Sequence, residues 1–342
     1  MSKLFENDYG VFISHKTYVD SLYQNVNGKG LQLNPNLFKI SKQYNSNRNV
    51  KSKIDHVNDK WDSLQKEQQE IKSRFNSFMD EFMQKNVLNF QESENKDALE
   101  AAELVYRESG KSLVNNAFGG NIGPETMKTI DNSIFVFPAN SIFFSKDISE
   151  IEMYLHEKKY DLILLDPPWW NKYIRRKRKK CGNAYGMLYN DDFKNIPIDK
   201  LLKDSGIVVV WCTNSPHHLN NLVTEIFPKW KVEFGGKWYW IKITSMGKPI
   251  CNFSLPPGKQ PFEQIIFGFR RNFAPSPFNS KLVVSVPSAI HSHKPPLVEL
   301  LKPFLSEDPS CLEIFARYLL PGWTSFGNEV LRLQHESLFI AV

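Results

Sequence analysis

The chain has 342 residues, of which 41% are hydrophobic and 13% aromatic, with 43 Lys and Arg against 37 Asp and Glu. This composition excludes a disulfide scaffold, a collagen and a wholly disordered chain, and the length fits two domains or one large domain with an N-terminal extension. The formal net charge is +6, and the excess lies entirely beyond residue 130. Much of it comes from an unbroken basic run at 175–180, which indicates a polyanionic partner or an import receptor.

The N-terminal part gives two kinds of signal. Residues 1–50 are rich in Asn, Lys and Ser and show little periodicity, so we predict irregular or marginally ordered structure there. From residue 54 to 83, apolar residues recur at the spacing of a long amphipathic helix. A second helix is expected at 97–105, and the Gly-rich stretch 119–124 indicates a turn. We therefore predict an N-terminal accessory region over 1–130 and the main domain over 131–342.

The main domain alternates between short apolar runs and helical patterns. Strands are predicted at 133–137, 160–165, 206–213, 231–243, 261–269, 281–286 and 310–316, with helices at 148–158, 198–203, 216–227 and 295–305. This order is typical of an α/β fold with a largely parallel sheet covered on both faces. In such sheets a ligand binds at the carboxyl ends of the strands, so the residues after each strand are the candidate site.

Cysteine and histidine spacing gives no metal or disulfide signal. The four cysteines are far apart, so we expect reduced, structural thiols. His291 and His293 lack a third ligand at a recognisable spacing, so no metal is expected. The N-terminus lacks the apolar core of a signal peptide, and no apolar run approaches the roughly 18–20 residues of a membrane span. An intracellular, soluble protein is expected.

The strongest chemical signal follows the predicted strand 160–165, which ends in Asp166-Pro167-Pro168-Trp169. An acid at a strand end, two prolines without N–H donors and a flat aromatic ring form a rigid ledge rich in acceptors. The ledge suits a purine's exocyclic amine, because the Asp166 carboxylate and the Pro167 carbonyl can each accept one of its hydrogens. The nitrogen lone pair is then directed at an electrophile, while Trp169 walls in a flipped base. Alone, the four residues fit an ordinary turn with a buried Trp equally well.

Further motifs in matching order supply a context. They are Ser292-His293-Lys294-Pro295-Pro296, Leu312-Glu313-Ile314-Phe315-Ala316-Arg317 and the stretch 322–329. With the Asp-Pro-Pro-Trp motif they resemble the adenosine N6-methyltransferase family typified by the catalytic subunit of the messenger-RNA methyltransferase, and most of all its methyltransferase-like protein 4 branch. The resemblance covers about residues 133–342. It implies a Rossmann-like α/β fold that uses S-adenosylmethionine, with the catalytic motif preceding the cofactor strand and 131–342 as the catalytic domain.

The resemblance also assigns residues to the cofactor. Those expected around S-adenosylmethionine are Asp147, Ile148, Asp166, Lys294, Phe315, Arg317, Asn328 and Glu329. In the family pattern the first two meet the adenine ring, the lysine lies near the cofactor carboxylate, and the last two bind the ribose hydroxyls. The chain has no Gly-x-Gly-x-x-Gly after its first predicted strand, so a dinucleotide dehydrogenase is not expected.

On the substrate side, the candidates come partly from the resemblance and partly from position. They are Trp169, Asn171, Arg175, Arg176, Lys177, Arg178, Tyr185, Trp211 and Glu263. Trp170 departs from the acidic residue that the branch carries at its position. The basic run either contacts substrate phosphates or is a nuclear-import signal, and both can hold together.

We therefore expect a methyltransferase that uses S-adenosylmethionine to modify N6 of adenine in nucleic acid. The branch implies RNA, with 2′-O-methyladenosine of a small nuclear RNA as one target, and DNA adenine is the rival. Two further hypotheses are a catalytically silent nucleic-acid-binding partner and an amino-methyltransferase for protein glutamine or a small molecule. We expect a monomer, since the N-terminal region can cover the catalytic domain, and a nuclear location with the cytoplasm as a second compartment.

Overall fold

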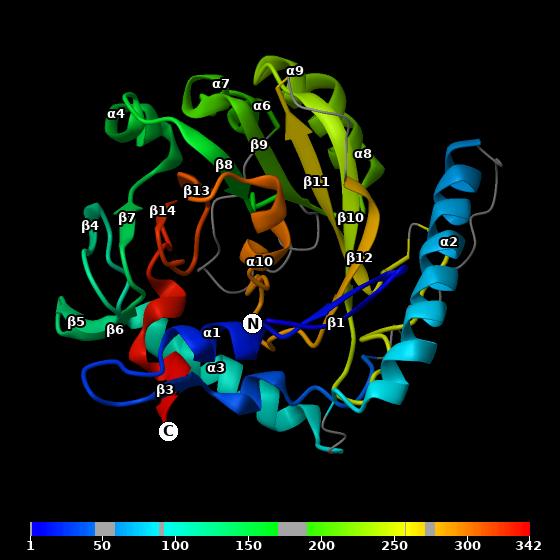
Figure 1. The fold of residues 1–342 in the computed structure, drawn as a ribbon, viewed down its shortest axis with the longest axis horizontal. Coiled ribbons are helices and arrows are strands. Elements are labelled where there is room, and N and C mark those ends of the chain that lie inside the picture. Colours follow the sequence, from blue (N-terminus) through cyan, green and yellow to red (C-terminus); the bar gives the residue numbers. More distant parts are fainter. Residues whose placement is uncertain (1, 45–58, 89–91, 170–189, 257, 271–277) are drawn as a thin grey trace, which may run out of the picture.

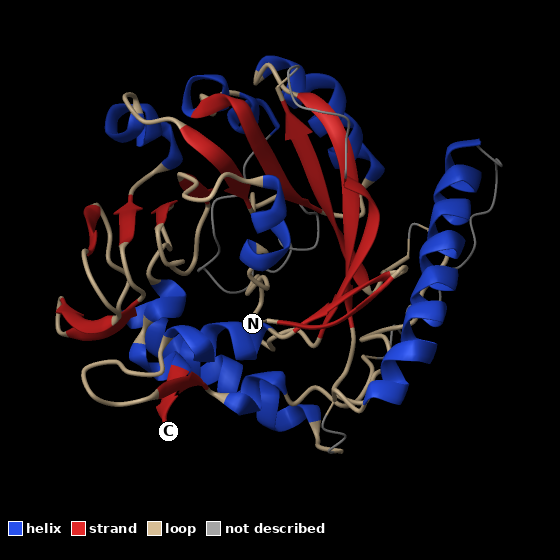
Figure 2. Ribbon diagram, viewed as in Figure 1, coloured by secondary structure: helices blue, strands red, loops and turns tan. Residues whose placement is uncertain are grey.

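The computed structural model describes residues 2–44, 59–88, 92–169, 190–256, 258–270 and 278–342. At its centre is an 11-stranded sheet with the order β1-β2-β12-β10-β11-β9-β8-β13-β14-β7-β4. Helices pack on both faces of this sheet (Figures 1 and 2). The predicted α/β class is confirmed, and the sheet is mixed rather than largely parallel.

The elements follow in chain order. The strands are β1 (Lys3–Asn7), β2 (Gly10–Ile13), β3 (Leu31–Leu33), β4 (Ala117–Asn121), β5 (Thr126–Ile130), β6 (Ser133–Phe137), β7 (Ser141–Ser145), β8 (Tyr160–Leu165), β9 (Leu202–Cys212), β10 (Glu233–Lys242), β11 (Phe262–Phe269), β12 (Phe278–Ser285), β13 (Cys311–Ile314), β14 (Trp323–Phe326) and β15 (Phe339–Ala341). The α-helices are α1 (His15–Leu22), α2 (Asp59–Phe82), α3 (Asn95–Lys111), α4 (Ile151–Leu155), α6 (Asn190–Lys194), α7 (Ile198–Leu201), α8 (Pro216–Asn221), α9 (Phe227–Lys229) and α10 (Val298–Leu301).

The parallel part of the sheet positions the candidate site. β9, β8, β13, β14 and β7 pair in parallel, while β11 joins β9 antiparallel. After β8 the chain continues to β9 on one side, and it returns later to β13 on the other. Such a reversal leaves a crevice at the carboxyl ends of the two central strands, where α/β sheets bind their ligands. β8 consists almost wholly of apolar side chains that are buried in the core, as a strand covered on both faces requires.

Several predicted elements differ from the observed ones for local reasons. β7 and β14 were not predicted, because serines flank β7 and Thr324 and Ser325 interrupt the apolar pattern of β14. The 295–305 helix begins only at Val298. The expected turn at 119–124 is wrong at its start, because Gly119 and Gly120 lie in β4. A Cβ on Gly120 would stand 2.2 Å from a backbone oxygen of β7, so the glycine permits a close approach of strands.

The expectation of irregular structure over residues 1–50 is wrong for the described residues 2–44. β1 and β2 form a hairpin, and β2 pairs with β12 to extend the central sheet. β3 pairs with β15 near the C-terminus. The apolar runs are too short to show a period, yet Val11, Phe12 and Ile13 are almost fully buried in the core. The boundary at residue 130 stays a sequence prediction, and segments on both sides of it contribute to the same sheet.

The long helix predicted over 54–83 is confirmed as α2 and lies beside β10 and β12 (Figure 1). Its apolar side packs on the outer part of the sheet through Ile71, Phe75, Phe78, Met79 and Phe82. Because these side chains meet the sheet of their own chain, the helix acts as a cover for the sheet.

Replacing Phe78 by Ala is expected to lower the free energy of unfolding by about 3–5 kcal/mol, because the buried ring leaves a cavity between α2 and the sheet. Denaturant unfolding followed by circular dichroism measures the change. Asp80→Ala is the matched control, since Asp80 is exposed on the same helix. An equal loss in both variants would contradict packing as the cause.

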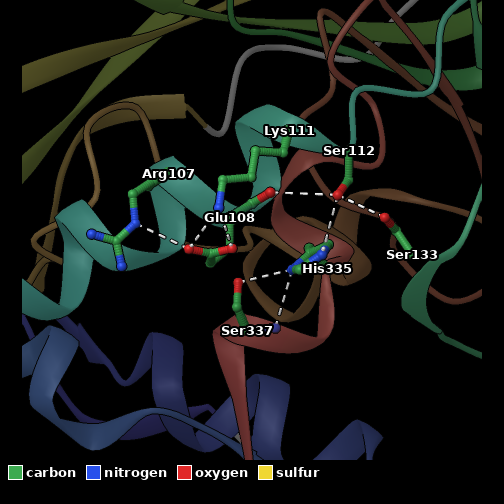
Figure 3. Close-up of polar contacts among 7 residues, drawn as sticks. All are labelled: Arg107, Glu108, Lys111, Ser112, Ser133, His335 and Ser337. Atoms are coloured by element: carbon green, nitrogen blue, oxygen red, sulfur yellow. Dashed lines mark hydrogen bonds and ion pairs between the residues drawn. The ribbon is translucent and has the colours of Figure 1, made fainter.

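The second predicted helix is confirmed as α3, which runs further than expected, and its end is fastened to the C-terminal part of the chain (Figure 3). Ser133 Oγ donates to Ser112 Oγ at 2.7 Å, and Ser112 Oγ lies 3.5 Å from His335 Nε2. His335 Nδ1 in turn accepts from the Ser337 N–H at 3.2 Å. A helix of the N-terminal region is thus joined to β6 and to the last turns of the chain.

Among the described residues, no helix has the length and apolar character to cross a membrane. In the same part of the chain, no group of His, Cys, Asp and Glu side chains could hold a metal ion. The described cysteines Cys212, Cys251 and Cys311 are free and buried.

Candidate active site

The site is built where β8 and β13 end side by side. Leu165 and Ile314 are register partners, so Asp166 and Phe315, the next residue of each strand, emerge at the same edge of the sheet. The Asp166 N–H points to the Ile314 carbonyl at 3.4 Å. The structure therefore brings together the Asp-Pro-Pro-Trp motif and the motif at 312–317, which are far apart in the sequence.

The ledge after β8 is a tight turn with its tryptophan buried. The Trp169 N–H donates to the Pro167 carbonyl at 2.8 Å, and the Trp169 indole N–H donates to the Trp211 carbonyl at 2.8 Å. The Trp169 ring packs against Phe193 and His218 with centroid separations of 5.3 and 5.0 Å. Trp169 is thus fixed as a wall of the site. The Pro167 oxygen keeps a second lone pair for a ligand, and Pro168 is half-buried beside it.

Asp166 ends a chain of alternating charges. Lys294 Nζ lies 3.5 Å from Asp166 Oδ1 and forms an ion pair with Glu263 Oε2. Glu263 Oε1 forms a second ion pair with Lys242, the last residue of β10. Glu263 lies at the start of β11. Because β11 is antiparallel to β10, the start of β11 lies at the same edge of the sheet as the ends of β8 and β10. The sequence-predicted substrate acid is therefore held between two lysines.

Two tryptophan rings lie close to Lys294 in this series of alternating charges. Lys294 Nζ lies 5.2 Å from the centroid of Trp211 and 5.8 Å from that of Trp240, within the range of cation–π attraction. The Trp240 indole N–H donates to Ser285 Oγ at 2.7 Å, which fixes this ring. Trp211 is itself buried in the core, so it contributes a backbone acceptor and a ring face rather than a mobile side chain.

Burial and charge act in opposite directions on these groups. Burial raises the pKa of the Asp166 carboxyl, and the charges of Lys294 and Arg317 oppose the rise. Burial also acts on Glu263, but Lys242 and Lys294 outweigh it and hold the Glu263 pKa well below its ordinary value. For Lys294, burial disfavours the cation, yet the two carboxylates raise its pKa overall. Glu263 and Lys294 therefore stay charged at neutral pH, and Asp166 is the member whose charge is most easily lost.

A second buried acid lies close enough to Asp166 for the two charges to interact. Glu313, on β13, has a pKa that burial raises to about 8, with the nearby Asp166 charge adding to the rise. At neutral pH the Glu313 carboxyl is therefore largely uncharged, and it adds little negative charge next to Asp166.

A cavity of about 630 Å³ is lined in part by Phe315, which emerges at the same sheet edge as Asp166. Among its lining residues are five that the sequence assigned to a cofactor: Asp147, Ile148, Phe315, Asn328 and Glu329. Asp147 caps the turn that precedes α4, where its carboxylate accepts from the Ser149 N–H at 3.0 Å and from Asn328 Nδ2 at 3.4 Å. The hydrogen bonds from Ser149 lower the pKa of Asp147, so the cavity rim carries a carboxylate.

Of the predicted cofactor residues that do not line the cavity, Arg317 contacts the lining residue Glu329. Arg317 Nε is 3.6 Å from Glu329 Oε2, and Arg332 forms an ion pair with Glu329 Oε1. The arginines orient the Glu329 carboxylate, which still has lone pairs for a ligand. Asp166 and Lys294 are paired with each other at the ledge and are not among the residues that line the cavity.

Gly327 permits the tight backbone at the cavity mouth. Its φ is +153°, and a Cβ there would stand 3.2 Å from the Cα of Phe315, which itself has a φ of +63°. Gly327→Ala is therefore expected to displace the Phe315 loop and to weaken nucleoside binding by about tenfold. Isothermal titration with S-adenosylhomocysteine measures this. Gly110→Ala on α3 meets nothing within 4 Å and is the control, so a similar loss there would contradict the explanation.

Sequence reasoning missed some residues and placed others beyond the described part of the chain. Lys242 could have been found, because it ends an apolar strand at the ligand edge. Leu113 and Asn115, which follow α3, line the cavity together with Asp192 and Asn195, and their sequence carries no signal for this. The predicted substrate residues outside the described residues are Asn171, Arg175, Arg176, Lys177, Arg178 and Tyr185.

Residues 160–329, which contain both the Asp-Pro-Pro-Trp motif and the motif at 312–317, match the MT-A70 family. This part of the chain belongs to the MT-A70 family. The resemblance inferred from the motifs is thereby confirmed, and the MT-A70 match begins at the first residue of β8.

Relatives in other organisms support the same assignment. The chain is 41% identical over 227 residues to the human N(6)-adenine-specific methyltransferase METTL4, an alignment that covers 63% of this chain and 47% of that protein. It is 34% identical over 223 residues to the Caenorhabditis elegans DNA N6-methyl methyltransferase, covering 63% and 58%. It is 35% identical over 215 residues to the N6-methyladenosine RNA methyltransferase MTA1 of Cryphonectria parasitica, covering 61% and 63%. The aligned part thus spans about half to two thirds of these relatives.

Proposed function

We propose that this chain transfers a methyl group from S-adenosylmethionine to N6 of adenine in nucleic acid. The observation that carries the proposal is the position of Asp166 at the end of β8, where it is paired with Lys294 and emerges at the same sheet edge as the cavity residue Phe315, within the MT-A70 match. The names of its relatives include both DNA and RNA methyltransferases. We favour RNA, with 2′-O-methyladenosine in a small nuclear RNA as the first target to test, and DNA is the rival.

The residues of the cavity fit the proposed cofactor. Its volume of about 630 Å³ is within the usual range for small-molecule sites. The Asp147 carboxylate offers an acceptor for an exocyclic amine, and Asn328 and Glu329 offer an amide and an acid to vicinal hydroxyls. When bound, S-adenosylmethionine supplies an electrophilic methyl group on a sulfonium.

The ledge would hold and orient the substrate amine. Asp166 Oδ and the Pro167 carbonyl each accept one amine hydrogen, which directs the nitrogen lone pair toward the cavity. Trp169 and Trp211 exclude water on one side. The nitrogen becomes acidic once it is alkylated, so its proton can pass to Asp166 Oδ or to solvent without a strong base.

The test is methyl transfer to matched RNA and DNA oligonucleotides, with and without 2′-O-methylation at the target adenosine, read by nucleoside mass spectrometry. We expect N6-methylated product with the wild type and its loss with Asp166→Ala. No product on any substrate, despite binding of cofactor and RNA, would support the silent-partner hypothesis. Binding of nucleic acid without salt dependence would instead favour the protein or small-molecule amine as substrate.

Two further expectations belong to this proposal. The N-terminal elements complete the sheet and line the cavity, which favours a self-sufficient monomer. A stable dimer in light scattering would contradict the monomer.

The basic run at 175–180 supports a nuclear location. Substitution of its Lys and Arg by Ser in a fluorescent fusion tests this, since the substituted protein should lose its nuclear location.

A further inference from the structure

Lys294 is carried by a loop rather than by the sheet. The loop of residues 286–297, here called the Lys294 loop, joins β12 to α10. Its own hydrogen bonds are short-range, from the Ile290 N–H to Ser288 Oγ and from the His293 N–H to the Ile290 carbonyl. The position of the Lys294 ammonium therefore depends on contacts from outside the loop. Some come from the main domain, namely the pairing with Asp166 and Glu263 and the hydrogen bond from the Tyr318 hydroxyl to the Lys294 carbonyl at 3.2 Å.

Two hydrogen bonds from the N-terminal region hold its first half. The Ala289 N–H donates to the Leu37 carbonyl at 2.7 Å. The Tyr106 hydroxyl, on α3, donates to the His291 carbonyl at 2.8 Å. Both bonds involve the loop backbone, so they fix its path whatever the loop side chains do.

One further contact from the N-terminal region holds its second half, and another lies just beyond the loop. The ring of His15, on α1, lies 4.2 Å from the ring of His293, centroid to centroid, and both side chains are buried. Burial lowers the pKa of both imidazoles, so they pack as neutral rings. Just beyond the loop, Glu299 of α10 accepts from the Ser2 N–H at 2.6 Å and from Ser2 Oγ at 2.7 Å. The start of the chain and α10 lie next to each other in Figure 1.

Tyr106 connects these contacts to the cavity. Its ring lies 4.7 Å from the Arg332 guanidinium, and Arg332 is paired with the cavity residue Glu329. The C-terminal end of α3 is fastened through Ser112 and His335, as Figure 3 shows, so the helix that carries Tyr106 is fixed against the body of the fold. The Tyr106 hydroxyl is thus directed at the loop by a helix that contacts the segment 332–335 at two points.

We propose that the N-terminal region is an internal clamp that helps to hold Lys294 between Asp166 and Glu263, acting on the Lys294 loop with Tyr106 as one of its positioning residues. Its consequence for catalysis rests on the proposed function, whereas the clamp itself is a property of the fold. The clamping residues Ser2, His15, Leu37 and Tyr106 lie outside the MT-A70 match at 160–329, yet through this loop they act on the charge environment of Asp166.

The first test uses the whole protein without ligands. Hydrogen–deuterium exchange of peptides from 286–297 is measured for the wild type, Tyr106→Phe and Tyr106→Phe with Glu299→Ala. We expect roughly tenfold faster exchange in Tyr106→Phe, the factor that follows from loss of one fixed hydrogen bond, and more in the double variant. The control is Tyr9→Phe, which removes an exposed hydroxyl in the β1–β2 turn. Unchanged exchange in a folded Tyr106→Phe protein overturns the clamp.

The second test asks whether the clamp positions Lys294. In Tyr106→Phe we expect Lys294 to move away from Asp166. The acidic limb of kcat/KM against pH then moves to higher pH than in the wild type, because the nearby cation had lowered the Asp166 pKa. If Tyr106 has a merely structural role, its substitution lowers activity without moving the acidic limb. Faster hydrogen–deuterium exchange of 286–297 with an unmoved limb therefore overturns the positioning of Lys294 by the clamp. A wild type without methyl transfer on any substrate contradicts the proposed function, while the exchange test still decides the clamp.

Discussion

Replacing Asp166 by Asn is expected to lower kcat/KM for methyl transfer by about 10²–10⁴-fold, the range for loss of a positioned acid–base or charge-stabilising group. Asn keeps the shape of the side chain and one oxygen acceptor, but it loses the negative charge, and its NH₂ group cannot accept a hydrogen from the amine. The neighbouring Lys294 then faces one carboxylate, Glu263, instead of two. Single-turnover kinetics with a fixed oligonucleotide separate this loss from weaker binding.

Asp204→Asn is the matched control for this substitution. Asp204 also lies on a strand of the parallel part, but at the opposite end of β9 and exposed to solvent. Its replacement should leave kcat/KM within about threefold of the wild type, as for surface substitutions away from the site. Activity of Asp166→Asn near the wild-type value would contradict the role of the charge, while binding of S-adenosylhomocysteine should survive in both variants.

The centre of the fold could be predicted from the sequence because its strands are buried on both faces. β8 appears as a largely apolar run that stops before Asp166, and in the structure the strand ends at Leu165. β14 could not be predicted in this way, since its Thr324 and Ser325 are buried between neighbouring strands and look polar in the sequence. The N-terminal hairpin was missed because its apolar runs are short, and only pairing with β12 gives them a core to enter.

The site was predictable as a set of residues but not as an arrangement of charges. The motifs named Asp166, Lys294 and Glu263, and the structure brings all three together. The sequence gives no sign that Glu263 is shared between two lysines, because Lys242 comes from another strand and enters only through sheet register. Tyr106 is equally invisible in the sequence, since its role depends on the packing of α3 against a loop that follows it by more than 180 residues.

The charge chain makes a prediction in which two substitutions act in opposite directions. Lys294 lowers the pKa of Asp166 and Glu263 raises it. Lys294→Met should therefore move the acidic limb of kcat/KM to higher pH, and Glu263→Gln should move it to lower pH, each by on the order of one unit. The sign follows because activity requires the ionised Asp166, so a higher pKa removes the active form sooner as the pH falls.

Lys294→Met is also expected to lower the plateau of kcat/KM by about 10²-fold, since the positive charge beside Asp166 and Glu263 is lost. Glu263→Gln keeps Lys294 charged and leaves it free to pair more fully with Asp166, so its plateau should fall less. Lys248→Met, at an exposed position beyond β10, is the control and should move neither the limb nor the plateau. If both active-site variants shift the limb in the same direction, the pKa of Asp166 is not set by this pair of charges.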